Sequence, residues 1–137
     1  MPFVSMESVS KCYDDQESRI GVTVLRQVSG GIEEGEFVAL MGPSGSGKST
    51  LLTILGAMNT PSSGRLLVDD IDVYGLPDER RADFRAQYLG FVFQQHHLMP
   101  YLNAVENVML PLAPLRMGRL EKRERAFAAL ERVGLGT

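Results

Sequence analysis

A glycine-rich stretch in the first half of the chain has the residue types that hold nucleotide phosphates. Residues 42–50 (GPSGSGKST) fit the pattern G-x-x-x-x-G-K-[ST] at every position. Gly45 and Gly47 allow backbone conformations that a side chain would forbid, so the amides of residues 45–50 can point at phosphate oxygens. The pattern therefore predicts nucleotide binding by Gly42, Ser44, Gly45, Ser46, Gly47, Lys48, Ser49 and Thr50.

Two side chains of this loop have the chemistry for a phosphate chain and its metal. The Lys48 ammonium is a mobile point charge that would reach the β- and γ-phosphates. The Ser49 hydroxyl would bind Mg²⁺, which keeps most of its water and takes few protein ligands. The alternative is a glycine-rich turn capped by serine and threonine, but the sequence on both sides favours the phosphate loop.

The flanking residues predict the elements that position this loop. The apolar run 37–41 predicts a buried strand before it, and residues 51–55 predict the first turns of a helix that runs from about 48 to 58. The proline and glycine in residues 59–64 would end that helix. A strand, a glycine loop and a helix N-terminus together form a phosphate site.

The rest of the chain also predicts alternating strands and helices. We expect strands near 3–11 and 21–28, joined by a turn at 14–17, and a polar turn at 33–36. After these come an expected hairpin of 65–68 with 71–73, a helix over 77–86 and a second buried strand over 89–93. A loop over 94–100 should lead to two further helices, over 104–110 and 121–133. The last helix has an apolar stripe of Phe127, Leu130 and Val133.

The bulk composition excludes several classes of protein. At 137 residues with 44% apolar side chains, the chain is one domain or part of one, and it is too apolar to be disordered. The net charge of −3 gives no electrostatic case for nucleic-acid binding. The single cysteine, Cys12, cannot form an internal disulfide and suits a reducing compartment. We find no apolar run of membrane-spanning length and no secretion signal, and therefore expect an intracellular chain without direct membrane insertion.

Three further features narrow the choice among phosphate-loop proteins. They are Tyr13 at the end of the first expected strand, residues 90–94 (GFVFQ) with the text that follows to 108, and residues 61–69 (PSSGRLLVD) after the helix. Together with the phosphate loop, these features resemble the nucleotide-binding domain of ABC transporters over essentially the whole chain. Residues 107–112 (NVMLPL) are similar to the branch that serves lipoprotein release, macrolide export and cell division.

The resemblance implies an α/β fold of the P-loop NTPase type. An N-terminal antiparallel β subdomain and the phosphate-loop core would occupy residues 1–94, and the Q-loop with the start of a helical subdomain would occupy 95–137. The implied function is an ATP-binding subunit that couples MgATP binding and hydrolysis to transport. Its partners would be a membrane permease and a second nucleotide-binding subunit, at the cytoplasmic side of the inner membrane.

The resemblance also assigns roles to single residues. Tyr13 would stack on the adenine ring, and Gln94 would contact Mg²⁺ or the attacking water and relay the nucleotide state to the permease. Lys48 and Gln94 would then be the catalytic residues, with Ser49 and Gln94 at the metal. The alternatives are an ordinary half-buried tyrosine and a polar residue that ends a strand.

Several parts of the family pattern do not occur in these residues. The Leu-Ser-Gly-Gly-Gln signature, the apolar strand that ends in Asp-Glu and the switch histidine are missing, and Asp70 stands where the hairpin tip commonly has glycine. We therefore expect the front portion of a nucleotide-binding domain, inactive alone. Its strands 37–41 and 89–93 would lack their neighbours in the sheet, so we expect swapping, local rearrangement or poor solubility.

Two other functions remain open from the sequence. The phosphate loop also resembles that of guanylate kinases, although that family has little sequence before its loop. A non-catalytic structural or interaction fragment is the other alternative, and it predicts no MgATP binding and no effect of Lys48→Ala.

Overall fold

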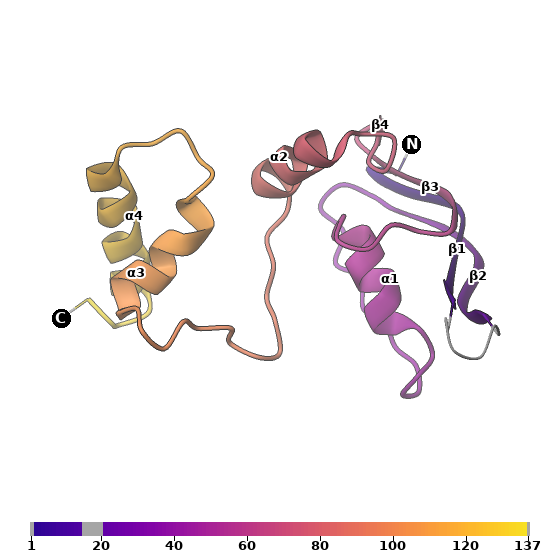
Figure 1. The fold of residues 1–137 in the computed structure, drawn as a ribbon, viewed down its shortest axis with the longest axis horizontal. Helices are drawn as coiled ribbons and strands as arrows, with labels where there is room; N and C mark the ends of the chain where they lie inside the picture. Colours follow the sequence, from indigo (N-terminus) through magenta and orange to yellow (C-terminus); the bar gives the residue numbers. More distant parts are fainter. Residues whose placement is uncertain (1, 15–20, 137) are drawn as a thin grey trace. The chain divides into compact units, whose positions relative to one another are not determined.

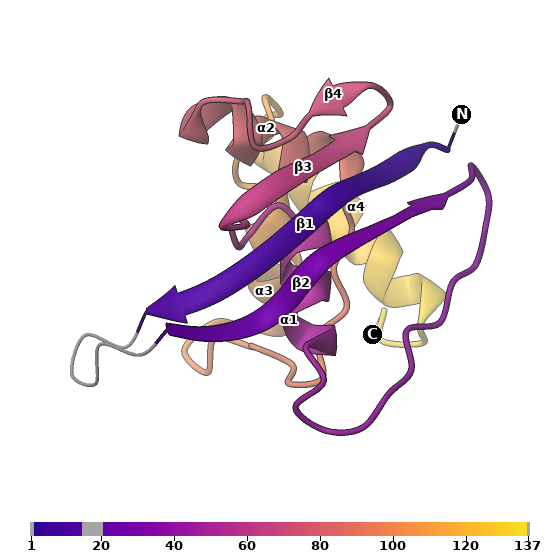
Figure 2. The same cartoon turned by 90° about the vertical axis from the view of Figure 1, so that its right-hand side faces the viewer.

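The computed structural model describes residues 2–14 and 21–136 and divides into two compact units, 1–89 and 90–137. The first unit contains a four-stranded sheet in the order β2-β1-β3-β4, in which all neighbours are antiparallel. Figure 2 shows these strands side by side. The strands are β1 (Val4–Asp14), β2 (Gly21–Ile32), β3 (Ser63–Val68) and β4 (Ile71–Asp72).

This sheet confirms the strands and the hairpin expected at the N-terminal end of the chain. Val4 of β1 pairs with Ile32 of β2 on one side and with Val68 of β3 on the other. The expected polar turn at 33–36 is also present, with the Glu36 amide 3.2 Å from the Glu33 carbonyl oxygen. Of the turn expected at 14–17, Asp14 ends β1, and residues 15–17 lie outside the described residues.

Two helices cover the sheet and form two adjoining core clusters. Helix α1 (Lys48–Leu55) buries Leu51 and Ile54 against Val9 and Leu25. The second cluster joins Phe84 of α2 (Asp78–Tyr88) to Ala57, Leu66, Val68 and Val73. Full burial of such an aliphatic or aromatic side chain contributes about 1.5–3 kcal/mol each. Both helices begin within one residue of the expected position.

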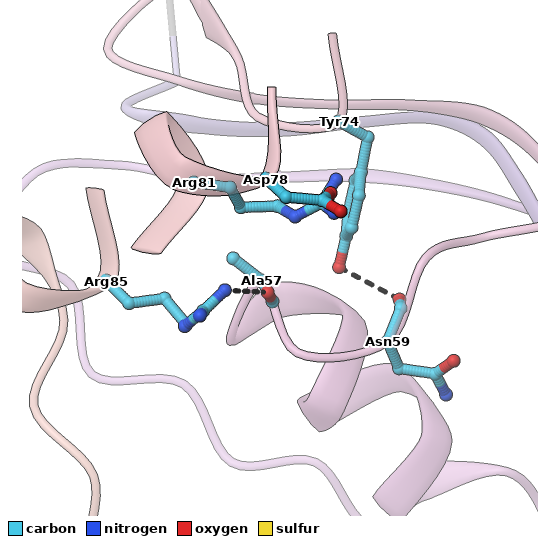
Figure 3. Close-up of polar contacts among 6 residues, drawn as sticks. All are labelled: Ala57, Asn59, Tyr74, Asp78, Arg81 and Arg85. Atoms are coloured by element: carbon cyan, nitrogen blue, oxygen red, sulfur yellow. Dashed lines mark hydrogen bonds and ion pairs between the residues drawn. The ribbon is translucent and has the colours of Figure 1, made fainter. Parts of the chain in front are cut away.

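Tyr74 packs against both clusters and makes polar contacts with the end of α1. Its hydroxyl lies 2.7 Å from the Ile54 carbonyl oxygen and 2.9 Å from that of Asn59. Figure 3 shows the Tyr74 hydroxyl pointing at the Asn59 carbonyl. Burial raises the pKa of Tyr74 to about 12, because the phenolate would lose its hydration. The neutral phenol therefore connects the segment between β4 and α2 to the turn after α1.

The prediction of two buried strands at 37–41 and 89–93 is wrong. Both segments are irregular, and neither is among the paired strands of the described residues. Phe37 is 96% exposed, Met41 87% and Val92 102%. An apolar run is compatible with a buried strand, but a strand forms only where a neighbour supplies backbone hydrogen bonds and a second layer covers the side chains. The described sheet gives these segments no paired neighbour, and of the segment 89–93 only Leu89 packs against a core cluster.

The second unit contains α3 (Ala104–Met109), the 3₁₀ turn η1 (Leu110–Leu112) and α4 (Arg119–Arg132). Helices α3 and α4 pack against one another (Figure 1). The N-terminus of α3 is capped reciprocally by Asn103 and Glu106, with both hydrogen bonds at 2.9 Å. Helices α3 and α4 confirm the two expected helices to within about two residues, the accuracy with which helix ends are defined, whereas η1 was not expected.

The apolar stripe expected on α4 is only partly right. Leu130 is buried, but Phe127 is 40% exposed and Val133 69% exposed, while the small Ala126 is buried instead. The prediction assumed that a wide face of this helix is covered, but a single neighbouring helix covers only a narrower face. Among the described residues, no helix has the length and apolar character needed to cross a membrane.

We predict that Tyr74→Phe lowers the free energy of unfolding by about 1–2 kcal/mol, because the one hydroxyl proton that the Ile54 and Asn59 carbonyl oxygens share is lost. Urea unfolding of the whole chain measures this, with Tyr88→Phe as the control because Tyr88 is half exposed on α2. Equal stability losses in the two variants would contradict the role given to the Tyr74 hydroxyl.

The stabilisation by the Tyr74 hydroxyl is also predicted to depend on pH. The folded-state pKa of Tyr74 is raised to about 12 from the ordinary value of 10.0, so the unfolded chain releases this proton first. The stabilisation is complete below pH 10 and is lost as the pH rises toward 12. The unfolding free energy of the wild type should therefore fall more steeply than that of Tyr74→Phe over this range, as urea titrations at several pH values would show.

Candidate functional site

The predicted phosphate loop leads directly into α1, and two of its glycines have left-handed backbone angles. Gly45 has φ +79° and Gly47 has φ +91°, a region that side chains strongly disfavour. Gly47 is also close to β2, where a Cβ atom would lie 2.9 Å from Leu25 Cδ2 and 3.1 Å from the Val24 carbonyl oxygen. Glycine at position 47 therefore serves both the turn and the approach of the loop to the sheet.

The first amides of α1 have no hydrogen-bonding partner among the residues that the structure describes. Its first intrahelical hydrogen bond runs from the Leu51 amide to the Gly47 carbonyl oxygen at 2.9 Å, and no side chain of the described residues caps the helix. The amides of Lys48, Ser49 and Thr50 precede that bond. They coincide with the positive end of the helix dipole, so this end of α1 favours an anion.

The Lys48 side chain folds back over the loop. Its Nζ donates to the Pro43 carbonyl at 2.6 Å, to the Gly42 carbonyl at 2.8 Å and to Ser46 Oγ at 3.3 Å. These three oxygens accept the hydrogen bonds of the ammonium that phosphate oxygens would accept in a complex. An anionic phosphate would form stronger, charge-assisted hydrogen bonds than these neutral oxygens do. The ammonium is therefore already within the loop that would receive a phosphate.

A concavity of about 610 Å³ opens at this loop. It is lined by Val24, Ser44, Gly45, Gly47, Lys48, Ser49 and Thr50. The lining combines backbone donors, one cation and hydroxyl groups, and this donor set fits a nucleotide phosphate chain. Ser49 is exposed in the first turn of α1, so its hydroxyl is accessible to a hydrated Mg²⁺.

Tyr13 lies at the end of β1 and belongs to the same unit as the loop. Its side chain is 44% exposed, and its hydroxyl accepts a hydrogen bond of 2.8 Å from Asn59 Nδ2. The pKa of Tyr13 is lowered, chiefly by the Asn59 amide and then by the Thr50 hydroxyl, against an opposing effect of burial. The structure thus brings the phenol of Tyr13 near the last residue of the phosphate-loop pattern.

Gln94 belongs to the second unit, whereas the other predicted site residues belong to the first. It is exposed at a bend inside the expected loop after residue 93. Nearby, the His97 ring meets the Phe93 ring edge-on, with 5.1 Å between centroids. The metal and catalytic role of Gln94 therefore stays a prediction from the family resemblance.

Sequence reasoning missed Asn59 and Thr53 as neighbours of the site. Asn59 was expected only to end the first helix, yet its side chain contacts both Tyr13 and Thr53. Local spacing contains no signal for this contact, because Tyr13 and Asn59 are 46 positions apart and only the folded sheet brings them together.

Comparison with known proteins gives one consistent family. A family profile described as "ABC transporter" matches residues 25–137. The chain is 42% identical over 132 residues to the uncharacterized ABC transporter ATP-binding protein YvrO of Bacillus subtilis, covering 96% of the chain and 57% of YvrO. It is 46% identical over 134 residues to the lipoprotein-releasing system ATP-binding protein LolD of Bordetella pertussis, covering 98% of the chain and 57% of LolD.

A larger protein and a solved structure extend this comparison. The macrolide export ATP-binding/permease protein MacB of Syntrophobacter fumaroxidans is 45% identical over 138 residues, covering 99% of the chain and 19% of MacB. A dimeric ATP-binding cassette in a post-hydrolysis state, bound to ADP and Pi, superposes with a TM-score of 0.82 at 42% identity, covering 93% of the chain and 56% of the cassette. The chain thus spans little more than half the length of YvrO, LolD and this cassette.

We predict that Gly47→Ala destabilises the chain more than Gly45→Ala does. Both substitutions force alanine into a left-handed conformation, which costs about 1–2 kcal/mol. Only the alanine at 47 also meets β2, which adds about 1–3 kcal/mol of overpacking, whereas a Cβ at 45 meets nothing within 4 Å. Urea unfolding of the two variants compares them directly, and equal losses would contradict the close approach of Gly47 to Leu25.

Proposed function

The chain belongs to the ABC transporter family, and from this premise we propose that its phosphate loop binds MgATP for a transport ATPase. The observation that carries the proposal is the Lys48 ammonium, bonded to loop oxygens at 2.6–3.3 Å beside the uncapped N-terminus of α1. A phosphate chain meets a cation and several amides there without rearrangement of the helix. Such preorganised charge stabilisation is the main contribution of a protein to phosphoryl transfer.

Each proposed ligand group follows from its place in the first unit. The amides at the start of α1 and the Lys48 ammonium would hold the phosphates, and the Ser49 hydroxyl would hold Mg²⁺. The exposed ring of Tyr13 would stack on the base, since every base has a π-face that an aromatic ring can cover. When bound, MgATP supplies the phosphoryl group whose transfer to water drives transport.

The partners proposed for the whole protein follow from its relatives. LolD belongs by name to a lipoprotein-releasing system, MacB combines ATP-binding and permease parts, and the solved cassette is dimeric. We propose that this protein likewise works with a permease and a second nucleotide-binding subunit at the cytoplasmic side of the inner membrane. Gln94 would contact Mg²⁺ or the attacking water and report the nucleotide state to the permease.

Family membership favours this function over the guanylate-kinase alternative suggested by the loop alone. The two are separated by a coupled assay with GMP and ATP, in which we expect no rapid formation of GDP. Rapid transfer of phosphate to GMP would overturn the proposal.

We predict that Lys48→Ala weakens the binding of MgATP at least tenfold, which corresponds to about 1.4 kcal/mol, because the phosphates lose their only side-chain cation in the loop. Titration with a fluorescent ATP analogue measures this. The control is Lys122→Ala, which removes an ammonium that bonds the Ala113 carbonyl in the second unit. Unchanged binding by Lys48→Ala would favour the non-catalytic structural fragment instead.

A further inference from the structure

The Asn59 side chain connects Tyr13 to the phosphate loop through hydrogen bonds. Its Nδ2 donates to the Tyr13 hydroxyl at 2.8 Å and lies 3.3 Å from Thr53 Oγ1. Thr53 Oγ1 in turn donates to the Thr50 carbonyl at 2.9 Å. Both hydrogens of one amide group are thus directed at hydroxyls, one on the expected base platform and the other on the helix that begins in the loop.

The backbone of Asn59 is held from several sides. Its amide donates to the Thr53 carbonyl at 3.2 Å, and its carbonyl oxygen lies 2.9 Å from the Tyr74 hydroxyl. On either side of it, Arg85 donates to the Ala57 carbonyl at 3.0 Å and Lys11 donates to the Thr60 carbonyl at 2.7 Å. Figure 3 shows the Arg85 and Tyr74 contacts converging on this turn, with the Asn59 side chain directed away from Tyr74.

Among the described residues, two further groups lie close to the Tyr13 side chain: the Thr50 hydroxyl and the Lys11 ammonium. The ring lies near the exposed end of β1, and the Lys11 ammonium, which also bonds the Thr60 carbonyl, is 5.0 Å from its centroid. Of these contacts, the Asn59 amide is the hydrogen bond that ties the hydroxyl to the turn after α1, and its loss would leave the exposed ring more rotamer freedom. A base gains most from stacking on a ring that is already oriented, because less side-chain freedom is then lost on binding.

We propose that Asn59 is the positioning residue that orients the Tyr13 ring relative to the phosphate loop and so determines how much the base adds to nucleotide affinity. The inference rests on the proposed function, because it assigns Asn59 to the same site. The proposed role of Asn59 needs no contact with the nucleotide. Asn59 acts through the Tyr13 hydroxyl, and the phosphates are bound independently by Lys48 and the helix N-terminus.

The test compares a ligand that has a base with one that has none. Wild type, Asn59→Ala, Tyr13→Phe, the double variant and Lys48→Ala of the whole chain are titrated with ATP and with inorganic tripolyphosphate, both with Mg²⁺. Asn59→Ala and Tyr13→Phe should each weaken ATP about three- to tenfold and change tripolyphosphate affinity less than about twofold. The double variant should be no weaker than Tyr13→Phe, because Tyr13→Phe already removes the hydrogen bond to Asn59 together with the contact to Thr50.

Tyr13→Phe keeps the turn after α1 intact, so it tests the proposal even if Asn59→Ala impairs folding. An ionisation measurement checks in solution the hydrogen bond on which the proposal depends, while the difference between ATP and tripolyphosphate separates positioning from a purely structural role. Because the Asn59 amide is the main cause of the lowered pKa of Tyr13, Asn59→Ala should raise that pKa toward its ordinary value. Ultraviolet titration, with the Tyr13→Phe spectrum subtracted, isolates this phenol from the other tyrosines.

The outcomes separate the inference from the proposed function. If Lys48→Ala weakens both ligands but Asn59→Ala weakens neither, or weakens both equally, the positioning role is overturned and the phosphate site stands. Additive effects in the double variant also overturn the role. If Lys48→Ala leaves both affinities unchanged, the proposed function fails and takes the inference with it.

Discussion

The packing of α1 on the β1–β2 face of the sheet is the constraint on which the candidate site depends. Leu51 and Ile54 lie three positions apart on one side of the helix and are buried against Val9 and Leu25. Burial of both side chains determines the rotation of α1 and the distance of its first turn from β2. Gly47 then lies where no Cβ would fit, so the conformation of the phosphate loop is a consequence of core packing as well as of glycine freedom.

The electrostatics of the site are local. The chain has a net charge of −3, which does not attract a polyanion over long distances. Affinity for phosphates must therefore come from donors at hydrogen-bonding distance, where salt screens little. The loop meets this requirement with a half-buried lysine whose ammonium bonds loop oxygens and with amides that precede the first bond of α1.

The turn after α1 combines a structural role with a role at the site. The last carbonyls of a helix need partners from outside it, and here the Thr53 and Ile54 carbonyls accept from amides of the turn. Arg85 and Lys11 hold the turn itself through the carbonyls of Ala57 and Thr60. The same turn carries the amide that contacts Tyr13. The residues that end the helix therefore also connect the two ends of the proposed nucleotide site, the base platform and the phosphate loop.

The sequence by itself determined the family and most helices and strands, and it predicted the phosphate loop. These features depend on local spacing: glycines at 45 and 47, the lysine that follows, and apolar residues at helical or strand intervals. The α/β nucleotide-binding fold is likewise confirmed by the superposition on a solved ATP-binding cassette. Sequence sufficed here because each signal lies within a few residues of the structure it specifies.

Only the tertiary structure decided which apolar runs become strands and which polar groups meet. Residues 37–41 are as apolar as a buried strand, yet Phe37 and Met41 are exposed because pairing requires a neighbour that local sequence does not encode. The contact of Asn59 with Tyr13 likewise exists because β1 and the end of α1 lie together in the folded unit. Both outcomes depend on residues distant in sequence, and long-range contacts of this kind leave no periodic pattern along the chain.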